Sequence, residues 1–213
     1  MTNPTGSFDG KPVSARADLT TSANQITLVL YNTIVDPEAV IQNLSAFSFT
    51  ISTGQTVGSL FSSSGKERTV YENKTFSDGG VVSTGWALSS SGGGLLLNGL
   101  DGAAEVPAYT IIGNPNGGTN TYLNANKSIA GNKPHNPFLH GPVTFTLNVL
   151  GVTEDSQIDS ATFSFGTAAG NDVAGLLVGG GPTAVPEPAS MAVWGSVLAV
   201  GAFARRRRRS IAA

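Results

Sequence analysis

The two histidines of the chain, His135 and His140, have the residue type and the proximity that a metal pair would need. They lie in the segment HNPFLH, where Pro137 prevents the two side chains from sharing one face of a helix. A metal site would also need a third ligand, and the sequence identifies no carboxylate for that role. We interpret both residues as exposed loop histidines, and a metal pair remains the alternative.

An acidic group and an amide-rich segment are further candidates for ligand binding. Glu154, Asp155 and Asp159 carry carboxylates that could bind calcium, but they lack the ordered spacing of a calcium loop. Asn114–Asn120 (NPNGGTN) could present amides to a sugar, although such stretches are typical of turns. We interpret both segments as solvated turns and predict neither a metal nor a cofactor.

Two serine-rich segments, Ser62–Gly65 and Ser90–Gly94, are candidates for a nucleophile. Neither is surrounded by the G-x-S-x-G pattern that places a serine on a strained strand-to-helix turn. We interpret both as turns. No other set of residues forms a persuasive catalytic group, so the sequence predicts a protein that is not an enzyme.

Trp86 is the candidate centre of a carbohydrate-stacking platform. Such a platform would combine it with an exposed tyrosine, and the candidates are Tyr71, Tyr109 and Tyr122. Trp86 lies among apolar residues, however, which favours packing in the core. We therefore expect a buried Trp86, with the platform as the alternative.

The composition indicates one β-rich domain. The chain has 213 residues, of which 40% are hydrophobic and only 12% charged, which is enough apolar material for one core. Surface helices need charged residues on their exposed faces, so the low charge favours strands and turns. Cysteine is absent, which excludes disulfides, thiolate nucleophiles and cysteine-based metal sites.

Alternating apolar residues predict strands throughout the first 165 residues. The clearest are Gln25–Tyr31, Ala46–Ile51, Val143–Leu150 and Ala161–Phe165, and the shorter candidates are Val57–Phe61, Arg68–Tyr71, Val81–Leu88, Gly94–Leu97 and Tyr109–Ile112. This number of short strands predicts an all-β fold, with a single β-sandwich or jelly-roll-like domain over residues 1–165. Asp36–Asn43 is predicted to contain a short helical turn, and Gly113–Pro142 a long surface loop.

Beyond this domain the composition changes twice. Gly166–Thr183 is rich in glycine and nearly uncharged, which predicts a flexible linker. Residues 184–213 then contain Pro186, Glu187 and Pro188, an apolar stretch from Ala189 to Ala204, and the run Arg205, Arg206, Arg207, Arg208 and Arg209. We predict that Ala189–Ala204 form one transmembrane helix, about 24 Å long, with the arginines on the cytoplasmic side. A buried core helix and a nucleic-acid-binding arginine run are the alternatives.

Charge argues against nucleic-acid binding by the domain. All 14 acidic residues lie within residues 1–187, whereas five of the 12 basic residues form the terminal arginine run. Residues 1–187 therefore carry seven basic and 14 acidic groups, a formal net charge of −7, and the basic groups are scattered singly. A phosphate-binding surface requires a basic patch, so we expect no nucleic-acid partner.

The order of Pro186-Glu187-Pro188, an apolar stretch and Arg205–Arg209 resembles the PEP-CTERM sorting signal. This resemblance implies recognition by exosortase, a membrane enzyme thought to cut at or near the motif and deliver the protein to the envelope or the exopolysaccharide matrix. Three segments, Gly10–Thr33, Asn43–Ser52 and Ala161–Thr167, also resemble a β-rich module found in surface proteins of that family. The resemblance implies a location and a processing enzyme, and it implies no reaction.

The sequence thus predicts a non-enzymatic, exported bacterial surface or extracellular-matrix protein. Its expected partners are exosortase, membrane lipid before processing, and exopolysaccharide. Two alternatives remain open, namely a carbohydrate-binding module or polysaccharide-acting enzyme displayed by the same route, and a permanently tail-anchored membrane protein. Met1–Thr20 has no basic and apolar signal-peptide pattern. We expect the natural start to lie upstream, or else the C-terminal helix to act as a tail anchor.

Overall fold

The structure is a computed structural model that describes residues 6–100, 109–133 and 135–177, and within these ranges it confirms the all-β class. One compact unit extends from Met1 to Gly179. Its strands are β1 (Gly6–Phe8), β2 (Lys11–Val13), β3 (Ala15–Ser22), β4 (Gln25–Asn32), β5 (Leu44–Ile51), β6 (Ser59–Val70), β7 (Phe76–Val82), β8 (Ala87–Ser91), β9 (Gly94–Asn98), β10 (Ile111–Ile112), β11 (Phe138–Asn148), β12 (Ile158–Phe165) and β13 (Asp172–Ala174).

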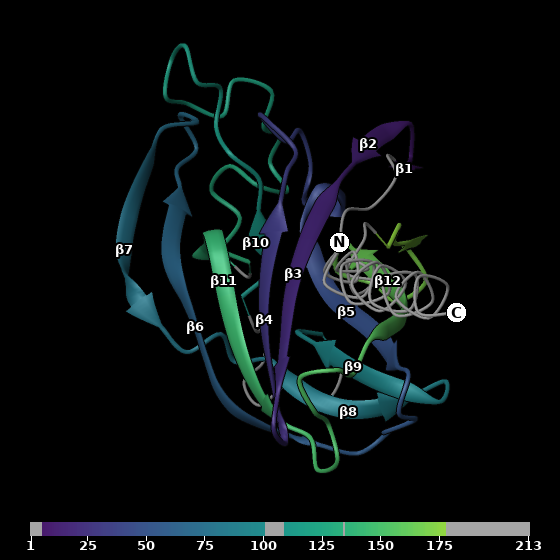
Figure 1. Cartoon of the computed structure of the whole chain (residues 1–213). Coiled ribbons are helices and arrows are strands. Elements are labelled where there is room, and N and C mark those ends of the chain that lie inside the picture. The colour runs from purple at the N-terminus through teal and green to yellow at the C-terminus, as the bar shows by residue number, and fades with distance from the viewer. Residues whose placement is uncertain (1–5, 101–108, 134, 178–213) are drawn as a thin grey trace, which may run out of the picture. The chain divides into compact units, whose positions relative to one another are not determined.

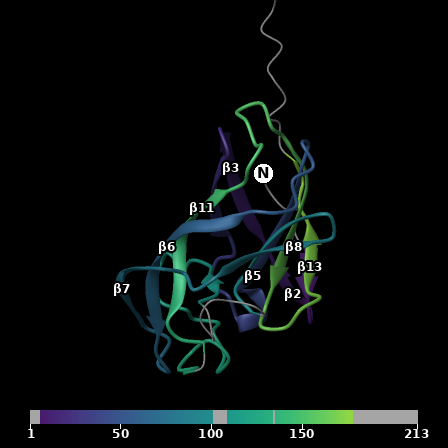
Figure 2. The same ribbon diagram turned by 90° about the horizontal axis from the view of Figure 1, so that it is seen from below.

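The large sheet consists of two groups of five strands. The first group has the order β3-β4-β11-β6-β7, and the second has the order β13-β12-β5-β9-β8. The short strand β10 joins them, because it pairs in parallel with β11 and antiparallel with β5. Figure 1 shows both groups, and the view from below in Figure 2 shows β6, β7 and β11 on one side and β5, β8 and β13 on the other.

The core lies between the two groups and is built by the alternation that the sequence shows. In β4 every second side chain from Ile26 to Leu30 is fully buried. Aromatic rings pack within this core: Phe47 and Phe163 of the second group lie 4.9 Å apart with tilted rings, and Trp86, between β7 and β8, lies 5.2 Å from Phe145 of the first group. Burying each such side chain stabilises the fold by about 2 kcal/mol, which fixes the register of the strands.

Strand β6 differs from the sequence prediction, because it runs straight through Ser62–Gly65, which we expected to be a turn. Pairing with β11 on one side outweighs the local turn preference. The Ser63 hydroxyl lies towards the interior and accepts hydrogen bonds from the Thr84 backbone N–H and hydroxyl, at 3.2 and 2.8 Å. Gly65 is buried against Leu139, where a Cβ atom would lie only 3.0 Å from a methyl group. Small residues at these positions permit close packing of strands rather than a reversal of the chain.

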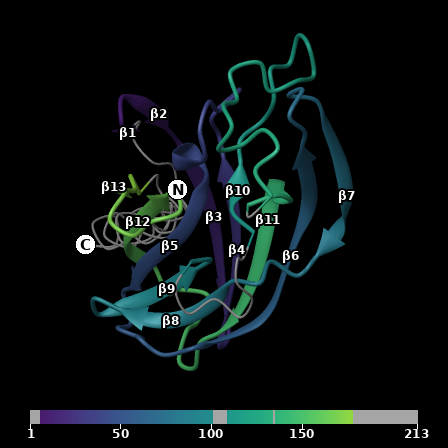
Figure 3. The ribbon, with the colours of Figure 1, turned by 180° about the vertical axis from the view of Figure 1, so that it is seen from behind.

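Gly113–Pro142 was predicted to be a long surface loop. Its described residues before β11, 113–133 and 135–137, form a loop, but the segment is not confined to the surface, and Phe138–Pro142 belong to β11. It contributes buried side chains to a second apolar cluster, which consists of Val70, Ile112, Tyr122, Ala125, Ile129, Ala130 and Phe138. Asn136 holds the segment against β6, because its side chain accepts a hydrogen bond from the Val70 N–H and donates to the Val70 and Ile129 carbonyls. Figures 1 and 3 show this segment in teal beside the ends of β6 and β7.

Of two other expectations, the short helical turn is confirmed and the flexible linker is confirmed only in part. The turn predicted over Asp36–Asn43 is a single 3-10 turn, Val40–Gln42, whose Gln42 side chain accepts hydrogen bonds from two preceding backbone N–H groups. Within the segment predicted as a linker, Asp172–Ala174 pair with β12 as strand β13. Phe163 packs beside Gly175 there, so the last strand extends the core further than the composition suggested.

The predicted transmembrane helix at Ala189–Ala204 lies outside the described residues, as does the rest of residues 184–213. Within the described ranges, no helix has the length and apolar character needed to cross a membrane.

Candidate functional site

The strongest cluster of charged side chains in the described part of the chain is centred on Arg68 of β6 and Asp78 of β7. The two residues are direct cross-strand partners. The Arg68 guanidinium donates two hydrogen bonds to the Asp78 carboxylate, from Nε to Oδ1 at 2.6 Å and from Nη2 to Oδ2 at 3.0 Å. It also lies over the ring of Phe76, 3.9 Å from the centroid. This two-point geometry is the strongest form of an ion pair between side chains, and the Arg68 side chain is only 7% exposed.

Tyr122 connects this ion pair to the segment between β10 and β11. Its hydroxyl accepts a hydrogen bond from Arg68 Nη1 at 3.2 Å and donates one to the Gly113 carbonyl at 2.9 Å. Its ring is fully buried and meets Phe76 edge-on at 5.7 Å. Burial raises the pKa of Tyr122, so the phenol stays neutral and keeps its proton for Gly113.

His140 of β11 completes the cluster from the other side of β6, where it lies opposite Lys66. Its Nε2 atom is 3.3 Å from Asp78 Oδ1, and Lys66 Nζ is 3.5 Å from Asp78 Oδ2. The His140 Nε2 atom is buried and makes no aligned hydrogen bond to the described residues. Burial, together with the nearby charges of Arg68 and Lys66, lowers the pKa of His140 despite the opposing effect of Asp78.

The electrostatics of the cluster favour a charged Arg68–Asp78 pair beside a neutral histidine. The hydrogen bonds from Arg68 lower the pKa of Asp78, against a smaller opposing effect of burial. Burial acts to lower the pKa of Arg68, but its hydrogen bonds to Asp78 and Tyr122 outweigh this and raise it. Asp78 therefore remains an anion held by Arg68 and Lys66, which makes it a poor proton acceptor. The arrangement is chemically suited to holding β6, β7 and β11 against the segment that contains Tyr122.

The two sequence-predicted histidines occupy different environments. His135 lies in a turn and is partly buried, which lowers its pKa. His140 lies in a strand, so the interpretation of an exposed loop histidine is wrong for it. The alternating pattern of the sequence predicted this strand only from Val143, but β11 begins at Phe138 and therefore includes His140. Among the residues that the structure describes, no three histidine or acidic side chains are placed to hold a metal ion.

The aromatic residues confirm the expectation of core packing. Trp86 is 1% exposed, and its Nε1 donates a hydrogen bond to the Tyr109 carbonyl at 2.6 Å. Tyr122 is buried, whereas Tyr71 is 45% exposed and shares a hydrogen bond with Ser77 through its hydroxyl. These side chains do not share one exposed face, so the stacking platform considered for Trp86 is not formed.

The two segments interpreted as solvated turns are turns in the structure. Glu154 and Asp155 are exposed in the turn between β11 and β12, whereas Asp159, also exposed, is the second residue of β12. In Asn114–Asn120, the Asn116 side chain accepts a hydrogen bond from the Gly118 N–H, and the Asn116 N–H donates to the Thr121 carbonyl. These bonds close the turn on itself.

The sorting residues Pro186, Glu187, Pro188 and Arg205–Arg209 lie outside the described residues. Conversely, the Arg68–Asp78 pair was not predicted, because its members are isolated charges in the sequence. The sequence offers one signal for the pair. If Arg68–Tyr71 is paired with the segment around Phe76 as a hairpin, the two charges come together.

No family model matches the chain, and neither a curated protein nor a solved structure matches it.

Proposed function

We propose that the chain is an exported bacterial surface or extracellular-matrix protein, sorted by exosortase through Pro186, Glu187 and Pro188, whose folded domain is not an enzyme. The observation that carries this proposal is the order of three chemically different parts within the last 30 residues. A proline-bounded acidic motif, an apolar stretch of helical length and five consecutive arginines form a combination that is more specific than any one of them.

The physical roles of the three parts support the proposal. A helix of sixteen residues, the length of Ala189–Ala204, would rise about 24 Å, which is enough for a thin membrane when the arginines reach the headgroups. The positive-inside rule holds Arg205–Arg209 in the cytoplasm and places the acidic domain on the other side. Proline disfavours helix and strand interiors, so the proposal places the cleavage motif Pro186–Pro188 ahead of the apolar stretch, where a membrane protease could bind it.

The domain itself supports a role in binding or scaffolding. We infer that its two five-stranded groups form a β-sandwich-like ectodomain, because they share one core and β10 links them at one point. Its one strong charged cluster in the described residues holds strands together, with Asp78 engaged by Arg68 and Lys66. Stability in this fold comes from packing and from such contacts, without disulfides.

Two other functions are kept as alternatives. A polysaccharide-acting enzyme displayed by the same route would need two carboxylates at glycosidase spacing. A permanently tail-anchored membrane protein would use Ala189–Ala204 without being cut. A signal-peptide pattern in frame upstream of Met1 would argue against tail anchoring.

Replacement of Pro186-Glu187-Pro188 by three alanines tests the proposal. The wild-type and variant chains are expressed in an exosortase-containing host and in the same host lacking exosortase, and each is analysed by fractionation and intact mass. We expect the wild type to lose its C-terminal helix only where exosortase is present, and the variant to remain membrane-bound with its full mass in both hosts. The substitution Pro182→Ala, just upstream of the motif, is the matched control and should be processed normally. The same mature mass for wild type and triple-alanine variant would contradict the proposal.

A further inference from the structure

The outer face of the first strand group presents ordered rows of uncharged polar side chains. The register of β3, β4, β11 and β6 places four such residues side by side in each of two rows. One row is Ser22, Gln25, Asn148 and Ser59, and the other is Thr20, Thr27, Thr146 and Ser62. Every member is a hydroxyl or an amide, whereas the residues between them in β4 and β11 are buried in the core. Neighbouring strands are about 4.8 Å apart, so each row extends for about 14 Å.

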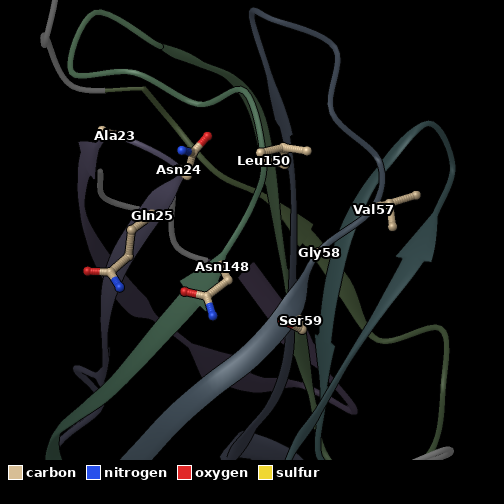
Figure 4. A pocket seen from close by; sticks show the side chains of 8 residues that line it. All are labelled: Ala23, Asn24, Gln25, Val57, Gly58, Ser59, Asn148 and Leu150. Atoms are coloured by element: carbon tan, nitrogen blue, oxygen red, sulfur yellow. The ribbon is translucent and has the colours of Figure 1, made fainter.

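The first of these rows leads into a groove of about 430 Å³ at the end of the sheet. The polar part of its lining comes from Asn24, Gln25, Asn148 and Ser59, and the apolar part mainly from Val57 and Leu150. These two apolar side chains are 77% and 81% exposed, so the fold does not use them for packing. Figure 4 shows the three amides gathered on one side of the groove and Val57 on the other.

The groove offers hydrogen-bonding groups that the fold leaves unused. Within the described part of the chain, the side chains of Gln25, Asn148 and Ser59 make no hydrogen bond, although Asn24 is held in place. The Asn24 side-chain oxygen accepts a hydrogen bond from the Gly151 N–H at 2.8 Å, and its backbone bonds to Val149 and Val152. A rigid hairpin end therefore carries free donors and acceptors, which lowers the entropic cost of binding a ligand.

Gly58 lets the chain lie close against β11 beside the groove. A Cβ atom at this position would lie 2.9 Å from the Asn148 carbonyl oxygen and 3.0 Å from a Val149 methyl group. The chain can pass this close to β11 only because residue 58 has no side chain.

We propose that this groove binds a segment of a neutral polysaccharide. Sugar hydroxyls donate and accept hydrogen bonds, which the amides of Gln25 and Asn148 and the Ser59 hydroxyl can exchange with them. The C–H faces of a sugar ring would contact Val57 and Leu150, as in other sites that combine apolar walls with a few placed polar groups. The lining contains no charged side chain, and residues 1–187 carry a formal net charge of −7, which disfavours an acidic polysaccharide.

The groove is suited to binding rather than to hydrolysis. Glycoside hydrolysis uses two carboxyl groups that flank the scissile bond, and no aspartate or glutamate lines the groove. This inference deepens the proposed function, because it names the matrix component that the domain would hold. It does not depend on how the chain reaches the matrix.

The test uses the full chain, purified in detergent micelles and titrated calorimetrically with cellohexaose, laminarihexaose, mannohexaose and chitohexaose, and with an alginate hexamer as the acidic probe. We expect at least one neutral hexasaccharide to bind and the alginate hexamer not to bind. In the double variant Gln25→Ala/Asn148→Ala, the affinity should fall about tenfold, as expected for the loss of two net hydrogen bonds. In Val57→Ser/Leu150→Ser, it should fall by about the same factor through loss of apolar contact.

Asn124→Ala is the matched control, since it removes an exposed amide from a different part of the chain. It should bind like the wild type, and all variants should keep the wild-type melting temperature because the altered side chains are at the surface. Binding to none of the neutral probes, equal binding of alginate, unchanged affinity in both double variants, or binding only to a protein partner would each overturn the proposal. Processing by exosortase is measured separately by intact mass, so a failure of sorting and a failure of sugar binding are distinguished.

Discussion

Arg68 and Asp78 face each other across β6 and β7 and share two hydrogen bonds of 2.6 and 3.0 Å. The pair lies at a junction, because Arg68 also bonds to Tyr122 and Asp78 also approaches Lys66 and His140. Removing one partner leaves the other charge partly buried without its counter-ion, and that residual charge is the main energetic cost.

We predict that Asp78→Asn and Arg68→Met each lower the free energy of unfolding by about 3 kcal/mol, as is typical when one member of a buried ion pair is removed. The double variant Arg68→Met/Asp78→Asn should lose less than the sum of the two single effects, because it leaves no isolated charge. Urea denaturation of the four proteins measures this coupling. Arg16→Met is the control, since its contact with Asp18 is exposed and should contribute less than about 1 kcal/mol. Strict additivity of the two single effects would contradict the prediction.

The histidines give the domain a predictable response to acid. Burial lowers the pKa of His140 and of His135 in the folded chain, so the unfolded chain binds these protons more readily. The stability that the two neutral histidines contribute is fully present when the pH is above the ordinary histidine pKa of about 6.5. It is lost as the pH falls through their lower pKa values in the folded chain. The charges facing His140 come from Lys66, Arg68 and Asp78. The lowered pKa of Asp78 acts in the same direction at a lower pH, below its ordinary value of about 3.8.

We therefore expect the melting temperature to fall between pH 7 and pH 5 in the wild type and to fall less in His135→Gln/His140→Gln. The single variants, compared with each other, show which histidine contributes more. Differential scanning calorimetry at several pH values provides the measurement. A melting temperature that rises on acidification through this range would show that the histidines are stabilised by protonation, contrary to their buried positions.

The sequence predicts some strands much better than others, and the reason is local. Gln25–Tyr31 and Ala161–Phe165 alternate apolar and polar residues because one face is in the core and the other is in solvent, and both are found as β4 and β12. β7 was missed at Ser77–Gly80, because its residues face solvent and its position depends on pairing with β6. β3 was also missed, since its outward residues are threonine, serine and charged residues that local patterns assign to turns.

The functional features differ in the same way. The proposed sorting signal is a linear motif, so Pro186–Pro188 and Arg205–Arg209 could be singled out from the sequence alone. The charged cluster and the groove depend on residues that are 10 to over 100 positions apart, such as Arg68 with Asp78 and Gln25 with Asn148. Only the strand register brings them together, and no local pattern in a single sequence specifies that register.

Two glycines in strands provide a test of the packing between neighbouring strands of one group. A Cβ atom on Gly94 of β9 would overlap the carbonyl oxygen of Phe49 in the neighbouring strand β5. A Cβ atom on Gly80 of β7 would meet nothing within 4 Å. Neither residue has a positive φ, so conformational preference does not separate them. We predict that Gly94→Ala lowers the free energy of unfolding by about 2 kcal/mol through overpacking, and that Gly80→Ala changes it by less than about 0.5 kcal/mol. Equal effects in urea denaturation would show that the β5–β9 contact is looser than described.

The arginine run yields the last prediction, which concerns membrane topology and rests on the proposed function. Replacing Arg205–Arg209 by five serines removes the charges that hold the C-terminus in the cytoplasm in the proposed topology, and it leaves a formal net charge of −7. We expect the C-terminus to become accessible to protease added outside the membrane, or the chain to be released without being retained by its helix. The matched control replaces the five arginines by lysines, which keep the positive charge and should keep the orientation. Protection of the C-terminus that is equal in the serine, lysine and wild-type chains would show that these charges do not determine the topology.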